Sequence, residues 1–150
     1  MKLRSPASKL KISALAIFIA LAVCPYSGLA DSDLPTGKTD AFFKQILAGD
    51  IDGAYNHLFA GSSIPENKPQ AVAYLKQQTT SALSLYGKPL GYELIRKEHF
   101  GRSLTRVVYI LHTKMLPIVW ELFFYKPKDS WFLVNIVFND KFNLLDAKNR

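Results

Sequence analysis

The stretch PIVWELFFYKPKDSWFLVNIVFND, residues 117–140, decides the fold, because it predicts two β-strands joined by a short turn. Aromatic and β-branched residues fill both arms, and KPKDS between them has the polar, proline-containing composition of a turn. One carboxylate, Glu121, stands in the middle of the first arm. The hairpin therefore predicts an antiparallel sheet and raises the question of what an acid does inside it.

Two further strands precede this hairpin. From Gly91 onward apolar residues recur with a period of two, which predicts strands at residues 92–100, 104–114, 118–125 and 131–139. The connections GRS, MLP and KPKDS are short enough for hairpins. We therefore expect a four-stranded antiparallel meander.

Helical spacing dominates the segment before the sheet. A first helix capped by Thr39 or Asp40 is expected to end at Gly49, and a second starts near Asp50 or Asp52. A third begins after Asn67, and its expected buried stripe is Val72, Leu75, Thr79, Ala82, Leu83 and Tyr86. Helices followed by strands predict an α+β domain, with three helices on one face of the sheet.

The first thirty residues have the layout of a secretory signal peptide. Four Lys and Arg without an acid precede the apolar run 12–23, and Gly28 and Ala30 place small residues before a cleavage point. The run is shorter than the roughly 20 residues of a membrane-spanning helix. We expect residues 1–30 to be removed, 31–38 to form a flexible leader, 39–145 to form the domain, and the protein to be periplasmic or secreted. An uncleaved anchor is the alternative.

The single cysteine, Cys24, ends the sequence LAVC, which resembles the lipobox of bacterial lipoproteins. Val23 stands where that pattern has a small residue, so lipidation is the less favoured alternative. Cleavage after Ala30 leaves a chain without cysteine, which needs no disulfide in an oxidising compartment. No membrane span then remains.

Charge and motifs argue against several classes of function. Cleavage removes four of the nineteen Lys and Arg and none of the twelve acids, which leaves fifteen minus twelve, a net charge of +3. This small, scattered charge gives no support to nucleic-acid binding. His57, His99 and His112 lack the spacing of metal ligands, and no glycine-rich phosphate loop occurs. We expect no metal and no cofactor.

The order of elements and the motif AGDIDGAYNHL at residues 48–58 resemble the nuclear transport factor 2-like (cystatin-like) superfamily, which includes ketosteroid isomerase and scytalone dehydratase. Trp131, at the start of the last strand, adds to a resemblance that covers nearly all of residues 39–140. It implies a cone-shaped cavity between helices and a strongly bent sheet. Members use that cavity for catalysis, ligand binding or dimerisation. The isomerases use a Tyr and two acids, and no matching pair of Asp occurs on these strands.

The last hairpin predicts which residues share a face. Strict alternation places Glu121 opposite Asn135 on a mixed face. The other face is wholly apolar, with the expected pairs Phe124–Phe132, Leu122–Val134 and Trp120–Ile136. Either the mixed face lines a cavity and the apolar face is buried in a dimer, or the apolar face packs on the helices and the mixed face meets a partner. Both alternatives predict more burial than a monomer with three helices provides, and we expect a homodimer through the sheet.

These observations favour an exported domain that binds a small apolar or aromatic ligand, or another protein, without identified catalytic residues. Tyr55, Tyr109, Glu121 and Asn135 are the polar side chains expected to reach the ligand, while apolar walls supply most of the affinity. The alternative is an isomerase- or dehydratase-like enzyme in which Glu121 is the general base.

Overall fold

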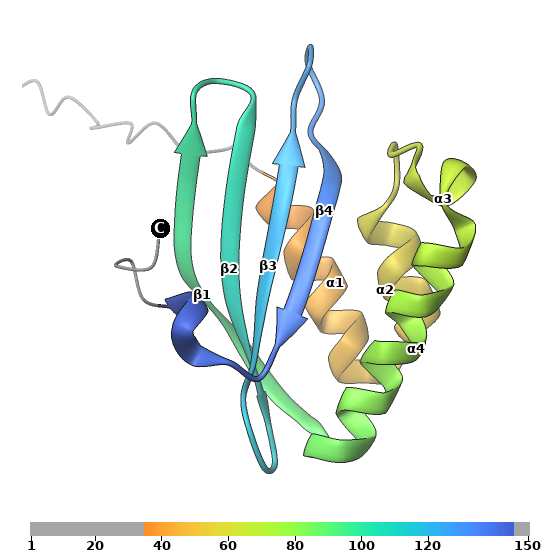
Figure 1. Cartoon of the computed structure of the whole chain (residues 1–150), viewed down its shortest axis with the longest axis vertical. Coiled ribbons are helices and arrows are strands. Elements are labelled where there is room, and N and C mark those ends of the chain that lie inside the picture. The colour runs from red at the N-terminus through yellow and green to blue at the C-terminus, as the bar shows by residue number, and fades with distance from the viewer. Residues whose placement is uncertain (1–34, 146–150) are drawn as a thin grey trace, which may run out of the picture. The chain divides into compact units, whose positions relative to one another are not determined.

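The computed structural model describes residues 35–145, so the expected signal peptide and Cys24 lie outside the described residues. Helices come first in this part of the chain and strands follow (Figure 1). No helix within it has the length and apolar character needed to span a bilayer. The predicted α+β order is confirmed.

The helices are α1 (Thr36–Ala48), α2 (Ile51–Leu58), α3 (Ile64–Asn67) and α4 (Pro69–Tyr86). Their ends follow local chemistry. Gly49 terminates α1 at φ 83°, a left-handed conformation that glycine adopts without steric cost. The Asp50 carboxylate then accepts a hydrogen bond of 2.8 Å from the Gly53 amide and so caps α2. The sequence predicted both the end of α1 at Gly49 and the start of α2 at Asp50. The start of α1 differs from the prediction, because the helix begins three residues before Thr39.

The segment between α2 and α4 differs from expectation, because it contains the four-residue helix α3 where the sequence predicts only a break. Pro69 occupies the first turn of α4, where its missing N–H leaves no helical bond unmade. Of the predicted stripe, Val72 and Thr79 are buried. Its other four residues, Leu75, Ala82, Leu83 and Tyr86, pack partly buried against the core.

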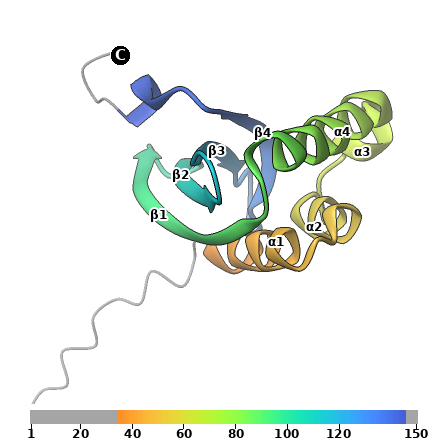
Figure 2. The same cartoon turned by 90° about the horizontal axis from the view of Figure 1, so that it is seen from below.

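The sheet contains β1 (Pro89–Phe100), β2 (Leu104–Thr113), β3 (Ile118–Tyr125) and β4 (Phe132–Asn139). Its order is β1-β2-β3-β4, and every neighbouring pair is antiparallel. This confirms the predicted meander. Figure 2 shows β1 bending strongly as it passes along the sheet. Register shifts interrupt its pairing with β2 between Pro89 and Gly91 and between Leu94 and Arg96.

The predicted register of the last hairpin is wrong. Phe124 pairs with Leu133 but Phe123 pairs with Asn135, so Val134 is an extra residue at a β-bulge. Glu121 lies opposite Val137, because the pairing is shifted by one residue on the turn side and by one more at the bulge. Alternation alone cannot reveal a bulge, because the bulge changes the alternation itself.

The apolar face of the hairpin is the one that packs on the helices. Trp120 is fully buried there, with ring centroids 5.3 Å from Phe42, 5.9 Å from Phe43 and 4.3 Å from Phe138. Tyr55 adds a ring from α2, 5.3 Å from Phe42. Contacts of this kind contribute about 0.5–1.5 kcal/mol per pair beyond the buried area. Aromatic rings thus fill the space between helices and sheet near its centre.

A C-terminal segment crosses the opposite face, called here the outer face. It leaves β4 after Asn139, beside β3, and forms the 3-10 helix η1 (Phe142–Leu145). Arg96 of β1, at the other edge, donates from Nη2 to the Leu145 carbonyl at 2.7 Å. In Figure 2, η1 lies on the side of the sheet away from α1. Val108 and Val119 are buried on this face although the helices lie on the other.

Candidate functional site

The two tyrosines predicted to reach a ligand lie on the helix-packed side of the sheet. Tyr55 is fully buried, and its hydroxyl is 2.7 Å from the Thr79 hydroxyl. Tyr109 is 4% exposed, and its hydroxyl is 2.8 Å from the hydroxyl of Thr39. Burial raises the pKa of both phenols. Each hydroxyl therefore already has a partner within the protein.

Glu121 lies on the outer face and is 7% exposed. Its Oε2 accepts hydrogen bonds from Nε of Arg106 at 2.5 Å and lies 2.5 Å from Nη2 of the same side chain. Nη1 of Arg106 donates to Glu98 at 2.8 Å. The Arg106 guanidinium also stands 5.9 Å from the ring centre of Phe123. The acid in the aromatic strand is thus one end of a Glu98–Arg106–Glu121 ion-pair chain, in which Arg106 and Glu121 are buried and Glu98 is partly buried.

Asn135 lies on the same outer face as Glu121, next to the bulge, and is exposed. The structure therefore divides the four predicted residues between the two sides of the sheet. Tyr55 and Tyr109 belong to the helix side, and Glu121 and Asn135 to the outer face. Neither of the two clefts described below is bordered by all four.

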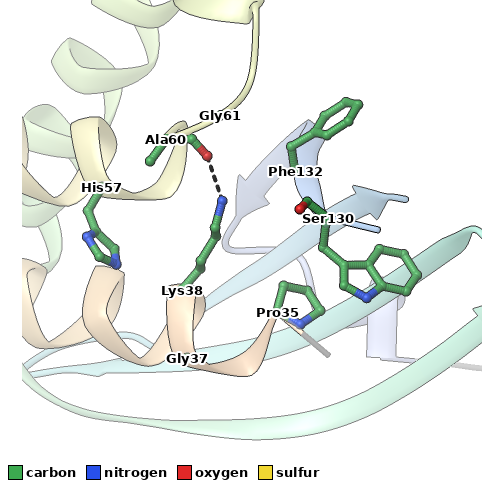
Figure 3. A pocket seen from close by; sticks show the side chains of 9 residues that line it. Pro35, Gly37, Lys38, His57, Ala60, Gly61, Ser130 and Phe132 are labelled. Atoms are coloured by element: carbon green, nitrogen blue, oxygen red, sulfur yellow. Dashed lines mark hydrogen bonds between the residues drawn. The ribbon is translucent and has the colours of Figure 1, made fainter. Parts of the chain in front are cut away.

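A cleft of about 630 Å³ opens between the helices and the sheet at the end where α1 and β4 begin. We call it the α1–β4 cleft. Figure 3 shows Lys38 reaching from α1 toward the turn after α2, with Ser130 and Phe132 on the strand side. Its described lining residues are Pro35, Gly37, Lys38, His57, Ala60, Gly61, Ser130, Trp131 and Phe132.

One wall of the α1–β4 cleft is basic. Lys38 is partly buried, and its Nζ donates to the carbonyl oxygen of Ala60 at 2.6 Å. Burial lowers the pKa of the Lys38 ammonium below its ordinary value. His57 lies on the last turn of α2 and borders the same space. Among the described lining residues there is no Asp or Glu.

The opposite wall is aromatic. Trp131 and Phe132 stand where the chain enters β4, and both are partly buried. The Phe132 ring lies 5.8 Å from the ring of Tyr125 on the outer face, so Trp131 supplies the aromatic surface of this wall. Lys126 lies 5.4 Å from the centre of the Trp131 ring. Trp131 was noticed in the sequence only as a marker of fold, and Lys38 fell in the expected leader. The signal available was a basic residue at the start of one element and two aromatics at the start of another, which no local spacing connects.

A second cleft, of about 450 Å³, lies where the start of α1 meets β1 and β2. The Tyr92 hydroxyl donates to the Asp40 carboxylate at its border, and Tyr109 lines it as well. Burial, followed by the hydrogen bond to Asp40, raises the pKa of Tyr92 to about 12. The Asp40 carboxylate is also bound by Lys44 at 2.6 Å. These polar groups are already paired with one another.

Neither metal chemistry nor a known relative points to another site. Within residues 35–145 no three His, Cys, Asp or Glu side chains form a group suited to a metal ion. His99 bonds Thr105 at 3.0 Å, and His112 lies 3.2 Å from Glu93. Comparisons with protein-family models, curated proteins and solved structures found no match to this chain.

Proposed function

We propose that this chain is an exported ligand-binding domain of the nuclear transport factor 2-like type, and that the α1–β4 cleft is its binding site. The observation that carries the proposal is the cleft itself, which lies between the helices and the sheet and combines an aromatic wall with a basic one. Its volume of about 630 Å³ falls in the range of small-molecule sites. The ligand class is a small molecule with an apolar or aromatic body.

The composition of the walls suits binding. Trp131 offers flat apolar surface, and such surface supplies most of the affinity in small-molecule sites. A few polar groups at the other side, including Ser130, fix orientation. The aromatic core around Trp120 is the wrong place for a ligand, because protein side chains already occupy it.

Binding fits the geometry better than isomerase- or dehydratase-like catalysis. A general base needs a carboxylate free to approach a substrate proton. Glu121 is instead held by Arg106 on the outer face, and it is absent from the described lining of the α1–β4 cleft. A reaction that used Glu121 would first have to break this buried ion pair.

A homodimer through the outer face is the partner we propose. Val134 and Val137 of β4 are 37% and 42% exposed, and Val137 lies on that face opposite Glu121. β4 is also an edge strand, so the patch is open to a second copy of the chain. Pairing two such patches would cover apolar side chains that one chain leaves in water.

Filling the α1–β4 cleft tests the proposed site. Gly37 borders it in the first turn of α1, and a Cβ added there would meet no other side chain within 4 Å, so Gly37→Leu is expected to fold. We expect Gly37→Leu to weaken binding of the neutral dye N-phenyl-1-naphthylamine, followed by its fluorescence, about tenfold or more, since one buried apolar group is worth about 1.5–3 kcal/mol. Gly91→Leu is the matched control, because Gly91 has similar free space and lies on β1.

Gly37 borders both clefts, so a second variant separates them. Ser130 lines the α1–β4 cleft and not the second cleft. We therefore expect Ser130→Phe to weaken dye binding as Gly37→Leu does. Equal dye affinity in Ser130→Phe, Gly37→Leu and the control would remove this cleft as the binding site. Circular dichroism checks that each variant keeps the fold.

A further inference from the structure

The charge of the α1–β4 cleft points to a more specific ligand. Two basic side chains, Lys38 and His57, border a space whose other wall is aromatic, and the described lining contains no carboxylate. Because the cleft carries positive charge without a matching acid, a ligand with one negative group and an apolar body complements both walls.

We propose that the α1–β4 cleft binds an aromatic carboxylate, with its ring against Trp131 and its carboxylate on the ammonium of Lys38. This inference rests on the proposed function and names the substrate class of the same site. It goes further because the neutral apolar ligands allowed above become weak ligands.

Lys38 is suited to this task by its position. A lysine ammonium has three N–H donors, and one of them binds the Ala60 carbonyl at 2.6 Å. That bond ties the Lys38 side chain to the turn after α2, as Figure 3 shows, and leaves two donors for an anion. A positioned charge loses less conformational freedom on binding than a mobile surface lysine.

The Lys38 environment also favours an anion energetically. Burial lowers the pKa of this ammonium, which means that the surroundings solvate its charge less well than water does. A ligand carboxylate restores the missing stabilisation through a charge-assisted hydrogen bond. An amide of the same shape offers an oxygen but no charge.

The test compares naphthalene-2-carboxylate with naphthalene-2-carboxamide by isothermal titration calorimetry at neutral pH. The two probes share the ring and differ in charge. We expect the carboxylate to bind the wild-type chain about tenfold more tightly, the usual scale of a charge-assisted hydrogen bond. Lys38→Met is expected to remove this preference and to leave carboxamide affinity within about twofold, while Lys38→Arg retains most of the preference.

The outcomes separate this inference from the function on which it rests. Equal affinities of the two probes for the wild-type chain would overturn the proposed preference for a carboxylate. The cleft would then remain a candidate site for neutral ligands. A carboxylate preference that survives Lys38→Met would overturn the role of Lys38. Failure of both probes to bind the wild-type chain would overturn the inference and the proposed site together. Preference in the wild type and in Lys38→Arg, with its loss in Lys38→Met, supports the proposal.

Discussion

Arg106 and Glu121 form a buried ion pair across β2 and β3, in which Nε and Nη2 of the guanidinium both lie 2.5 Å from one carboxylate oxygen. Arg106 is 4% exposed and Glu121 7%. Neither charge is tolerable alone at such burial, because removing an ion from water costs several kcal/mol. The pair answers the question raised by an acid within an aromatic strand: its carboxylate neutralises an arginine on the neighbouring strand.

Breaking this pair from one side should destabilise the domain. We expect Glu121→Ala to lower the free energy of unfolding by about 3 kcal/mol, since it leaves a buried guanidinium without one of its partners. The double variant Arg106→Met/Glu121→Leu should recover most of that loss, because apolar side chains of similar size suit a buried site. Urea unfolding followed by circular dichroism measures both.

The control for this prediction is Glu93→Ala. Glu93 is 54% exposed and pairs with His112 at 3.2 Å, so its loss should cost less than about 1 kcal/mol. A Glu121→Ala variant as stable as this control would show that the buried pair does not have the structural role assigned to it.

Tyr55 is expected to act in stability and not in binding. Tyr55→Phe removes the 2.7 Å hydrogen bond to Thr79 and should cost about 1 kcal/mol, while Thr79 keeps its 2.9 Å bond to the Leu75 carbonyl. The affinity for naphthalene-2-carboxylate should be unchanged, because the hydroxyl lies in the core. Parallel thermal unfolding and calorimetry check the two effects. A large loss of affinity at wild-type stability would instead return Tyr55 to the binding site.

The domain should lose stability in alkali through Tyr92. Its pKa is raised to about 12 in the folded chain, while an unfolded tyrosine has a pKa of about 10. Such a group stabilises the fold fully below the unfolded value and loses that contribution as pH rises through the folded value. Unfolding free energies should therefore fall between pH of about 10 and about 12, less steeply in Tyr92→Phe. Tyr74 is exposed, so the unfolding free energy of Tyr74→Phe should depend on pH as that of the wild type does.

The proposed homodimer predicts twice the chain mass in sedimentation equilibrium. Val137→Lys should shift the population to monomer, because it places a charge in the exposed apolar patch of β4. Leu85→Lys is the control, since Leu85 is 65% exposed on α4. Monomeric mass for the wild-type chain at micromolar concentration would contradict the dimer.

Much of the fold could be predicted because its signals are local. Gly49 and Asp50 define the boundary between α1 and α2 through one backbone conformation and one cap. The change of apolar period near Gly91 gives the start of the sheet. The register of β3 and β4 could not be predicted, because the alternation of apolar residues reveals neither the one-residue shift on the turn side nor the bulge at Val134. The burial of Val119 was likewise not predictable from the alternation, because Val119 lies on the outer face and the helices lie on the other.

The candidate site was less predictable than the fold. Lys38, His57 and Trp131 come from three elements far apart in the sequence, and only packing places them around one cleft. Glu121 attracted attention as an isolated acid, yet its partner is Arg106, fifteen residues away on the neighbouring strand. A charged residue within a buried strand indicates that it needs a partner of opposite charge, but the sequence does not show which residue is that partner.

The most direct test of the central claim uses the two tryptophans of the chain, because one lines the α1–β4 cleft and the other lies in the core. In ¹H–¹⁵N spectra, titration with naphthalene-2-carboxylate should shift the indole N–H signal of Trp131 progressively and leave that of Trp120 in place. Trp131→Phe assigns the two signals. A ligand that shifts the Trp120 signal while the Trp131 signal stays fixed, or that shifts neither, would contradict binding in the α1–β4 cleft.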